Sequence, residues 1–408
     1  MLLDFKKLMS ARFLFTFGVQ MQAVIIGWRM YDLTHDPLHL GLIGLAEAIP
    51  ALSLALYAGY VVDRSRPLRV YKWVLRGSLL SALVLLVSSL GMGQLSLSAQ
   101  VGALFLSSLI TGFARGFSQP ALFAAVPRIV PRSELPKASA WMTSALQIAR
   151  ISGPGLGGLI YGWFGVGATA GLISVILVAA IISMGLIEAD PEAPQVVAKK
   201  NVRQELFSGV SFVFRHPILL PALSLDMISV FFGDMVALLP IFAAEILFVG
   251  PKGLGVLRAA PAVGAAIASY LLTRVNLREK AGNMLMVAVT GFGACILVFA
   301  LSHSFYLSLA VLALSGAFDS VSMVIRGAAV QLVSPDHMRG RISAVNSIFI
   351  GSSNELGQFE SGVAAKLLGT VPSVLFGGAV CLLTVGATAV LSPTLRKMNL
   401  DELEAKPL

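Results

Sequence analysis

Long apolar stretches follow one another along most of the chain, separated by short polar segments. Each is long enough to cross the hydrocarbon of a bilayer as a helix, because a span needs roughly 20 apolar residues. Apolar and polar residues do not alternate as they do in the strands of membrane barrels. The pattern therefore predicts an all-α membrane protein with twelve transmembrane helices. The stretches lie at about 11–33, 40–62, 70–92, 98–126, 134–162, 165–187, 218–247, 253–273, 282–303, 305–333, 339–367 and 371–393.

One long hydrophilic segment, 188–216, divides these stretches into two sets of six. Apolar residues recur at helical spacing in its second part, from Val202 to Val213, among charged neighbours. This spacing predicts a short amphipathic helix on the membrane surface. The expected organisation is a six-helix bundle at 1–187, a cytoplasmic linker at 188–216, a second bundle at 217–393 and a cytoplasmic tail at 394–408.

The two halves repeat each other weakly. Glu47-Ala-Ile-Pro50 matches Arg258-Ala-Ala-Pro261 at an offset of 211 residues, and Gly112 matches Gly316 at an offset of 204. Parallel six-helix repeats related by an axis along the membrane normal are a transporter architecture whose site lies between the repeats near mid-membrane. We therefore expect two pseudo-symmetric bundles.

Composition supports a membrane class. Hydrophobic residues make up 56% of the 408 positions and charged residues 12%, about half the charged share of a soluble domain. The net charge of +9 does not indicate nucleic-acid binding, because the basic residues gather in alternate loops, as in cytoplasmic loops of membrane proteins. This distribution predicts an inner-membrane protein with both termini in the cytoplasm.

Metal and cofactor sites are not expected. The two cysteines, Cys295 and Cys381, lie within apolar runs and are interpreted as buried small hydrophobes. His35 and His39 have helical spacing, but no carboxylate or thiolate supports them as metal ligands, so a solvated loop is favoured. The chain has no His-Glu-x-x-His, Gly-x-Ser-x-Gly or phosphate-binding Gly-x4-Gly-Lys motif. An intramembrane enzyme is therefore disfavoured.

The loop after the second stretch resembles a signature of the major facilitator superfamily. Gly59-Tyr-Val-Val-Asp63-Arg64-Ser-Arg66 is similar to the superfamily's Gly-x3-Asp-Arg-x-Gly-Arg-Arg, with Arg66 in place of the later glycine. The resemblance implies that Gly59, Asp63 and Arg64 help to lock the cytoplasmic side, together with Arg339 and Arg341 of the second half. The alternative is a solvated loop of the positive-inside kind.

A second resemblance lies in the fifth stretch. Gly153-Pro154-Gly155-Leu156-Gly157-Gly158 resembles the Gly-Pro-x-x-Gly-Gly antiporter motif of the superfamily's exporters. It implies export rather than uptake, whereas close helix packing is the alternative interpretation of its small residues. The segment from Ser334 to Gly362 is similar to a bacterial branch that includes the enterobactin exporter and related multidrug exporters.

Charged side chains inside the bilayer are costly, and they face partners or a wet cavity. The offsets place Arg115 opposite Asp319 and Glu47 opposite Arg258, so that oppositely charged mates could attract in one state and separate in another. The alternative is that each charge pairs within its own half, with Arg326 as a partner of Asp319. The interior charges are Arg29, Glu47, Arg115, Arg150, Asp226, Asp234, Arg258, Asp319, Arg326, Glu355 and Glu360.

A proton-coupled carrier needs a carboxyl group that titrates near neutral pH. Asp226, Asp319, Glu47, Glu355 and Glu360 all qualify by position. We therefore expect a monomeric secondary transporter that exports amphipathic, siderophore-like or drug-like molecules in exchange for protons by rocker-switch alternating access. An uptake symporter or a lipid flippase of the same fold remains an alternative.

Overall fold

The computed structural model describes residues 3–91, 95–188, 202–274, 278–335 and 338–405, and these ranges contain helices and turns but no strand. Contacts between Cα atoms divide the chain into two compact units. Unit 1 comprises Met1–Val197 and Leu239–Ala259, and unit 2 comprises Ala198–Leu238 and Ala260–Leu408. Each unit therefore holds most of one half of the sequence.

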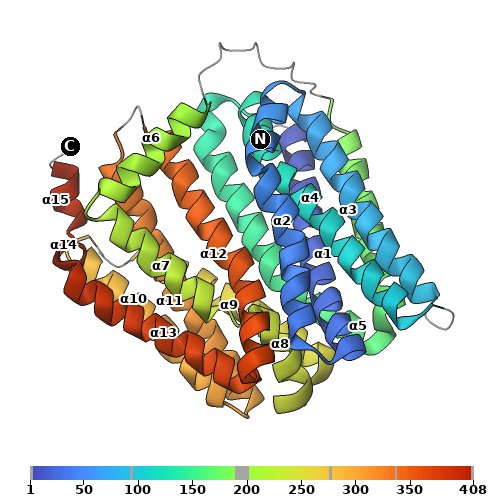
Figure 1. The fold of residues 1–408 in the computed structure, drawn as a ribbon. Helices are drawn as coiled ribbons and strands as arrows, with labels where there is room; N and C mark the ends of the chain where they lie inside the picture. The colour runs from blue at the N-terminus through green and yellow to red at the C-terminus, as the bar shows by residue number, and fades with distance from the viewer. Residues whose placement is uncertain (1–2, 92–94, 189–201, 275–277, 336–337, 406–408) are drawn as a thin grey trace. The chain divides into compact units, whose positions relative to one another are not determined.

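Unit 1 is a bundle in which α1 packs on α5, and α4 packs on both α2 and α3 (Figure 1). Residues at the N-termini of α2 and α4 determine where these two helices start. The Asp36 carboxylate accepts a hydrogen bond from the Leu38 amide at 3.0 Å and Pro37 opens α2, while the Ser96 hydroxyl accepts from Ala99 at the start of α4. The helices are α1 (Leu3–Thr34), α2 (Pro37–Asp63), α3 (Pro67–Leu90), α4 (Leu97–Ile129) and α5 (Leu135–Gly185), with a 3-10 turn, η1 (Arg132–Glu134).

Helix α5 holds two membrane spans. Its backbone leaves the helical region at one residue, Gly165, where φ is 76° and ψ is −177°. A residue with a side chain is strained at such a φ, whereas glycine adopts it freely. Gly165 thus separates the two spans that the sequence places at 134–162 and 165–187.

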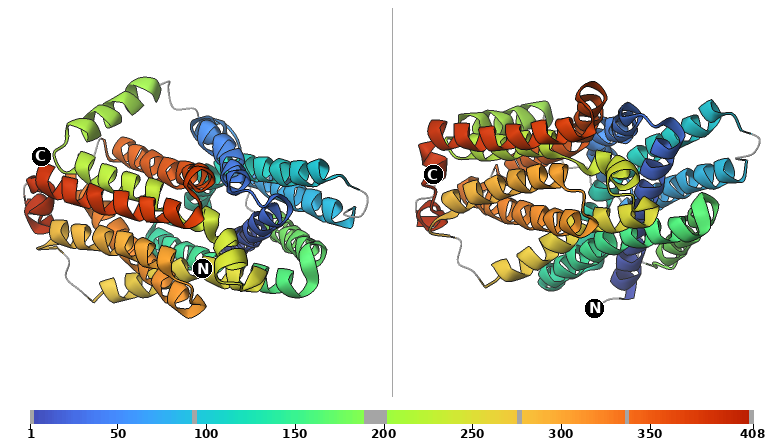
Figure 2. Two further views of the ribbon diagram at one scale, coloured as in Figure 1. Left: turned by 60° about the horizontal axis from the view of Figure 1, so that its bottom comes forward. Right: turned by 90° about the horizontal axis from the view of Figure 1, so that it is seen from below.

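Unit 2 packs α10 against α11 and α13, and α7 against α12 and α13 (Figure 2). The amphipathic segment of 188–216 contains α6, which lies against α12 and buries Val213 there; residues 189–201 of the expected linker lie outside the described residues. The helices are α6 (Val202–Arg215), α7 (Leu219–Gly233), α10 (Ala281–Leu301), α11 (Phe305–Val333), α12 (Arg339–Leu368), α13 (Thr370–Leu391), α14 (Pro393–Arg396) and α15 (Leu400–Ala405).

The seventh span is broken, whereas the sequence predicts one uninterrupted stretch at 218–247. Helix α7 ends at Gly233, and Asp234 has an extended backbone. A 3-10 turn η2 (Val236–Leu238), a short α8 (Leu239–Ile241) and a π-helical turn η3 (Phe242–Ile246) follow before α9 (Gly250–Leu272). The boundary between the units falls at this break and again in α9 beside Pro261.

The described helices account for twelve membrane spans. Ten helical stretches are long and apolar enough to cross a membrane. One of them, Arg132–Gly185, contains both spans of α5, and α12 adds a further span that carries Glu355 and Glu360. The chain is thus an all-α, multi-pass membrane protein built from two sets of six spans, as the sequence predicts.

The same helix crossing occurs in both halves. In unit 1, a Cβ atom on Gly112 of α4 would lie 2.2 Å from the carbonyl oxygen of Glu47 in α2. In unit 2, a Cβ atom on Gly316 of α11 would lie 2.0 Å from the carbonyl oxygen of Pro261 in α9. The glycines matched in the sequence repeat therefore occupy equivalent contacts, where only a residue without a side chain lets the helices touch.

Candidate functional site

An ion pair joins α4 to α2 within unit 1. Arg115 Nη1 donates to Glu47 Oε1, and both side chains are partly exposed. The pair follows from the Gly112 crossing, because Gly112 brings α4 against the backbone of Glu47 and Arg115 lies one turn further along α4. This ion pair joins two charges of the same half of the sequence. Arg115 and Asp319 belong to different units, so attraction between them stays a prediction.

Arg150 of α5 is affected by the charge of Arg115. The charges of Arg12 and Arg115 both act on Arg150 of α5. Among the described residues, Arg150 makes no ion pair, although it is one of the predicted cavity charges. Arg150 therefore lies within electrostatic reach of two other arginines of unit 1, one of which, Arg115, is paired with Glu47.

Unit 2 contains a cluster of one arginine and two aspartates, of which the arginine and one aspartate are buried. Arg326 Nη2 lies 2.6 Å from Asp226 Oδ1, with side chains 5% and 8% exposed. Arg326 Nε also donates to the Ser322 hydroxyl at 3.2 Å. Asp319, seven residues before Arg326 on α11, interacts electrostatically with both Arg326 and Asp226. Sequence spacing suggested Arg326 as a partner of Asp319, and the structure adds α7 to the cluster through Asp226.

Two further carboxylates lie near the break of the seventh span. Asp234 Oδ1 accepts from the Val236 amide at 2.9 Å, and its carbonyl accepts from the Ser361 hydroxyl of α12 at 2.5 Å. Glu360, the neighbour of Ser361, interacts electrostatically with Asp234. Glu355 is half-buried on the same helix. The break therefore brings Asp234 and Glu360 together, although they are distant in the sequence.

The antiporter-like motif forms tight helix contacts within unit 1. Cβ atoms on Gly153 and Gly157 would lie 2.8 Å from Gln20 Cβ and 2.9 Å from Met21 Cα of α1. A Cβ atom on Gly158 would lie 2.6 Å from Gly255 Cα and 2.5 Å from the Pro251 carbonyl oxygen of α9. Pro154 lies inside α5 and its carbonyl faces Gly255. The motif thus packs α5 against both α1 and α9.

Two polar contacts hold the segment Leu239–Ala259 within unit 1. Arg258 Nη1 donates to the Ala23 carbonyl oxygen of α1 at 2.8 Å, and the Tyr31 hydroxyl donates to the Glu245 carboxylate. Glu47, the repeat mate of Arg258, has Arg115 as its ion-pair partner. Arg258 therefore binds a main-chain carbonyl of α1.

The proposed gate residues lie at helix ends. Gly59 lies near the end of α2 with open space around it, and Asp63 is the last residue of that helix; the side chain of Asp63 is outside the described residues. Arg64 stacks on the Tyr60 ring at 4.2 Å and donates to its hydroxyl. Arg339 begins α12, and Arg341 donates to Ser208 of α6 at 3.2 Å.

Sequence reasoning missed a buried polar cluster in unit 1. The Gln22 side-chain nitrogen of α1 lies 2.7 Å from the Ser81 hydroxyl, 3.1 Å from that of Ser107 and 3.0 Å from that of Thr111. Gln22 is 2% exposed. Such residues hydrogen-bond across helices in membranes, and the only signal was an amide in the middle of an apolar stretch.

His216 caps the start of α7 outside the membrane spans. Its Nδ1 accepts from the amides of Ile218 at 3.2 Å and Leu219 at 3.3 Å. The side chain is buried, and this burial lowers the pKa of His216. A neutral ring is needed for Nδ1 to accept these hydrogen bonds, so the cap and the burial favour the same protonation state.

No three histidine, cysteine, aspartate or glutamate side chains in the described ranges gather closely enough to hold a metal ion. The chemistry that these groups offer is therefore charge pairing and proton binding. Both cysteines are buried and free.

Known proteins resemble this chain in sequence and fold. A family model described as transmembrane secretion effector matches residues 3–407. The enterobactin exporter EntS of Escherichia coli O1:K1 is 25% identical over 243 residues, which are 60% of this chain and 58% of that protein, and EntS of Citrobacter koseri matches over the same shares. The matched region thus spans less than two thirds of these relatives.

Solved structures share the fold. A bacterial homologue of the iron transporter ferroportin, in an inward-facing state, aligns with a TM-score of 0.73 at 18% identity, covering 96% of this chain and 98% of that one. A POT family transporter in complex with a thioalcohol-conjugated peptide aligns with a TM-score of 0.73 at 12% identity, covering 96% of both chains. At these identities the likeness concerns the fold alone.

Proposed function

The chain belongs to the transmembrane secretion effector family of the major facilitator superfamily, and on this premise we propose that it exports amphipathic small molecules in exchange for protons. Membership makes it a membrane transporter of small molecules and not an enzyme. The substrates proposed are siderophore-like or drug-like.

The observation that carries proton coupling is the cluster of Asp226, Asp319 and Arg326. It holds one positive charge and two groups that can be negative; Asp226 and Arg326 are buried in unit 2 and Asp319 is half-buried. Such a cluster is neutral only when one carboxyl group carries a proton. Because uncompensated charge is costly inside a membrane, a change in access to water or in the position of Arg326 would load or release that proton.

The electrostatic interaction between Arg115 and Arg150 supports a role in substrate binding. Arg115 is engaged by Glu47, whereas Arg150 makes no ion pair among the described residues. An intramembrane charge of this kind marks a substrate or ion pathway. We assign Arg150 and Arg115 to a polar region that receives the charged part of an amphipathic substrate. Glu355 and Glu360 on α12 are further candidates for proton binding.

Export is favoured over uptake by two observations. The matched relatives are named as exporters, and the Gly153–Gly158 motif packs α5 against α9 at backbone contact. An uptake symporter and a lipid flippase share the same fold. They differ in the direction of coupling or in the substrate, which transport measurements distinguish.

The proposed mechanism is rocker-switch alternating access by a monomer in the bacterial inner membrane, with both termini in the cytoplasm. Protonation of the Asp226–Asp319–Arg326 cluster would change the relative stability of two states, since a ligand shifts an equilibrium only by binding the two states differently. Asp63, Arg64, Arg339 and Arg341 would stabilise the state that is closed toward the cytoplasm.

Transport by the purified protein tests this proposal. Proteoliposomes would receive a pH gradient of either sign, with a panel that includes a catecholate siderophore and cationic dyes. We expect at least one compound to move against the direction of proton flow and to stop moving when a protonophore collapses the gradient. Movement with the protons, or movement that ignores the gradient, would contradict antiport.

A further inference from the structure

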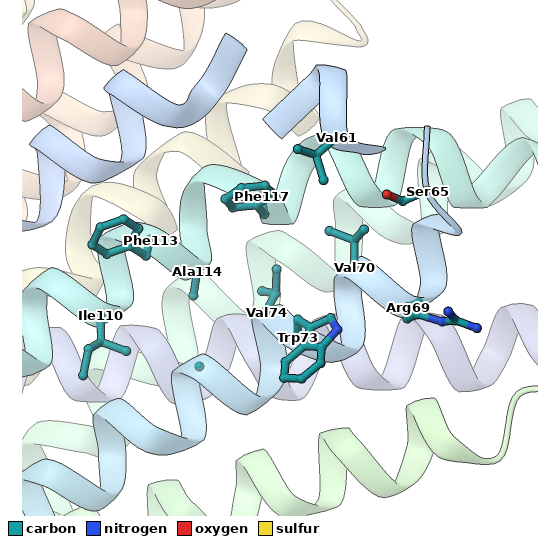
Figure 3. Close-up of a pocket in the computed structure, with 11 residues that line it drawn as sticks. Val61, Ser65, Arg69, Val70, Trp73, Val74, Ile110, Phe113, Ala114 and Phe117 are labelled. Atoms are coloured by element: carbon teal, nitrogen blue, oxygen red, sulfur yellow. The ribbon is translucent and has the colours of Figure 1, made fainter. Parts of the chain in front are cut away.

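A groove of about 430 Å³ runs along the surface of unit 1. Its floor is α4, and its walls are α3 and the last turns of α2, as Figure 3 shows. Trp73 and Phe113, which line it, are 64% and 47% exposed. The groove is therefore open along its length on the outside of the bundle, where a membrane protein meets lipid.

The groove is polar at one end and apolar along the rest. In Figure 3, Ser65 and Arg69 lie at one end, while Ile110 and Phe113 lie at the other and Trp73 lies between them. Arg69 is in the first turn of α3, and the lining on that helix continues to Gly77, roughly 12 Å further along its axis. This polarity matches a lipid, with a charged head and a hydrocarbon tail.

The polar end has unused hydrogen-bond donors. Within the described ranges, neither the Arg69 guanidinium nor the Ser65 hydroxyl has a hydrogen-bond or ion-pair partner, although Ser65 is half-buried. Arg64 nearby is engaged differently, because it stacks on Tyr60. With respect to the side chains that the structure describes, the donors of Arg69 and Ser65 are available for an anion at the mouth of the groove.

A second arginine increases the positive charge. Arg76 is exposed and stacks on the Trp73 ring at 5.0 Å. Arg69, Trp73 and Arg76 are spaced four and three residues apart, so they lie on one face of α3. Arg76 is not among the residues that line the groove, whereas Arg69 is, so Arg69 is the arginine that meets a headgroup there and favours a net negative one over a zwitterionic one.

We propose that this groove binds one acyl chain of an anionic phospholipid, with the headgroup phosphate held by Arg69 and Ser65. The chain would lie over α4 between Trp73 and Phe113. Arg69 contributes the headgroup selectivity, and the apolar lining contributes the hydrophobic contact. This site is independent of the transported substrate, because its lining faces outward from unit 1 and includes none of the intramembrane ion pairs.

Trp73 is itself a reporter of the bound chain. The sequence has four tryptophans, so the full-length protein carrying Trp28→Phe, Trp141→Phe and Trp163→Phe has a single indole in the groove. Bromine atoms on an acyl chain quench tryptophan fluorescence by contact. This protein would be reconstituted in vesicles that contain dibrominated phosphatidylglycerol diluted in phosphatidylcholine, and in the reverse mixture with bromine on phosphatidylcholine.

We expect phosphatidylglycerol to bind beside Trp73 about fivefold more strongly than phosphatidylcholine, the preference that one arginine near the surface provides. Arg69→Gln should abolish this preference, whereas Arg132→Gln, at an exposed arginine outside the groove, should retain it. Equal quenching by the two lipids, or a preference that survives Arg69→Gln, would overturn the proposal.

A second variant tests the apolar part of the groove. A Cβ atom on Gly77 would lie 3.8 Å from Ala114 Cβ, an ordinary contact, so Gly77→Leu places a side chain in the groove. Its control is Gly102→Leu on α4, where a Cβ atom meets nothing within 4 Å. Gly77→Leu should reduce quenching of Trp73 by dibrominated phosphatidylglycerol, and Gly102→Leu should not. Equal quenching in both variants would mean that the acyl chain does not occupy the groove.

Discussion

Arg326 and Asp226 form an ion pair between α11 and α7 that is almost completely buried in unit 2, with a distance of 2.6 Å between Nη2 and Oδ1. The two residues are 100 positions apart in the sequence, and no motif links them. Asp319 interacts electrostatically with Arg326 of this pair. The pair therefore connects two helices of the second half. Together with Asp319 it forms the cluster on which the proposed proton coupling rests.

Substituting one member of this pair should destabilise the protein more than substituting both members. Arg326→Met leaves Asp226 buried without its partner, and such a loss costs about 3–5 kcal/mol. The double variant Asp226→Leu with Arg326→Met removes both charges of the pair and should recover part of that loss, since Asp319 still lacks Arg326. Thermal unfolding in detergent, followed by the fluorescence of a thiol-independent dye, would measure both. A double variant as unstable as Arg326→Met alone would show that the pair is not isolated from the rest of the cluster.

Asp319→Asn should stop proton-driven transport while leaving the protein folded. The Asp226–Arg326 pair does not need Asp319, so we expect the melting temperature to change little. Asparagine cannot carry the exchanged proton, and transport driven by a pH gradient should therefore fall to background. Asp401→Asn, at an exposed aspartate of the tail that pairs with Arg278, is the matched control. Normal pH-driven transport by Asp319→Asn would remove this residue from the mechanism.

Gly158→Ala should damage the protein although it adds only one methyl group. The new Cβ atom would lie 2.5 Å from the Pro251 carbonyl oxygen and 2.6 Å from Gly255 Cα, so α5 and α9 must move apart. We expect a loss of about 1–3 kcal/mol in stability and a strong loss of transport. Gly155→Ala in the same motif meets nothing within 4 Å and is the control. Equal effects of the two substitutions would exclude the backbone contact as the cause.

The His216 cap should make stability depend on pH. Burial lowers the pKa of His216 in the folded protein, so below the ordinary value of about 6.5 the unfolded chain binds the proton first. Stability should be constant above that pH and fall as the pH drops below it toward the folded pKa. Melting temperatures of wild type and His216→Asn between pH 8 and pH 5, values chosen to bracket about 6.5, would test this. Asparagine keeps an acceptor but does not titrate, and its curve should be flatter; parallel curves would contradict the assignment.

The fold could be predicted from the sequence because its cause is local. A run of about 20 apolar residues must form a helix in hydrocarbon, and α1 to α4 and α10 to α13 lie where such runs occur. The break at Asp234 was not predictable in the same way. The residues around it are as apolar as those of an unbroken span, and the break depends on contacts such as the hydrogen bond from Ser361 of α12.

The charges of the site could be predicted as a set but not as pairs. Arg115, Glu47, Asp226 and Arg326 were all identified as interior charges, since any ionised residue in an apolar run needs a partner. Repeat offsets relate positions by symmetry, whereas ion pairs form between side chains that lie within reach, such as Arg115 beside Glu47 at the Gly112 crossing. The buried hydroxyl groups were missed for a related reason, because serine and threonine hardly change a hydropathy pattern. Ser81 and Thr111 stand out only in the structure, where Gln22 hydrogen-bonds to them.

The pH inside proteoliposomes tests the central claim most directly. Vesicles with wild-type protein would be loaded with a transported compound and a lumenal pH dye, at the same pH inside and outside, and then diluted into compound-free buffer. As the compound leaves, an antiporter must bring protons in, so the account predicts that the lumen becomes acidic and that Asp319→Asn abolishes this change. A lumen that becomes alkaline, as in symport, or one whose pH stays constant while the compound leaves, would contradict it.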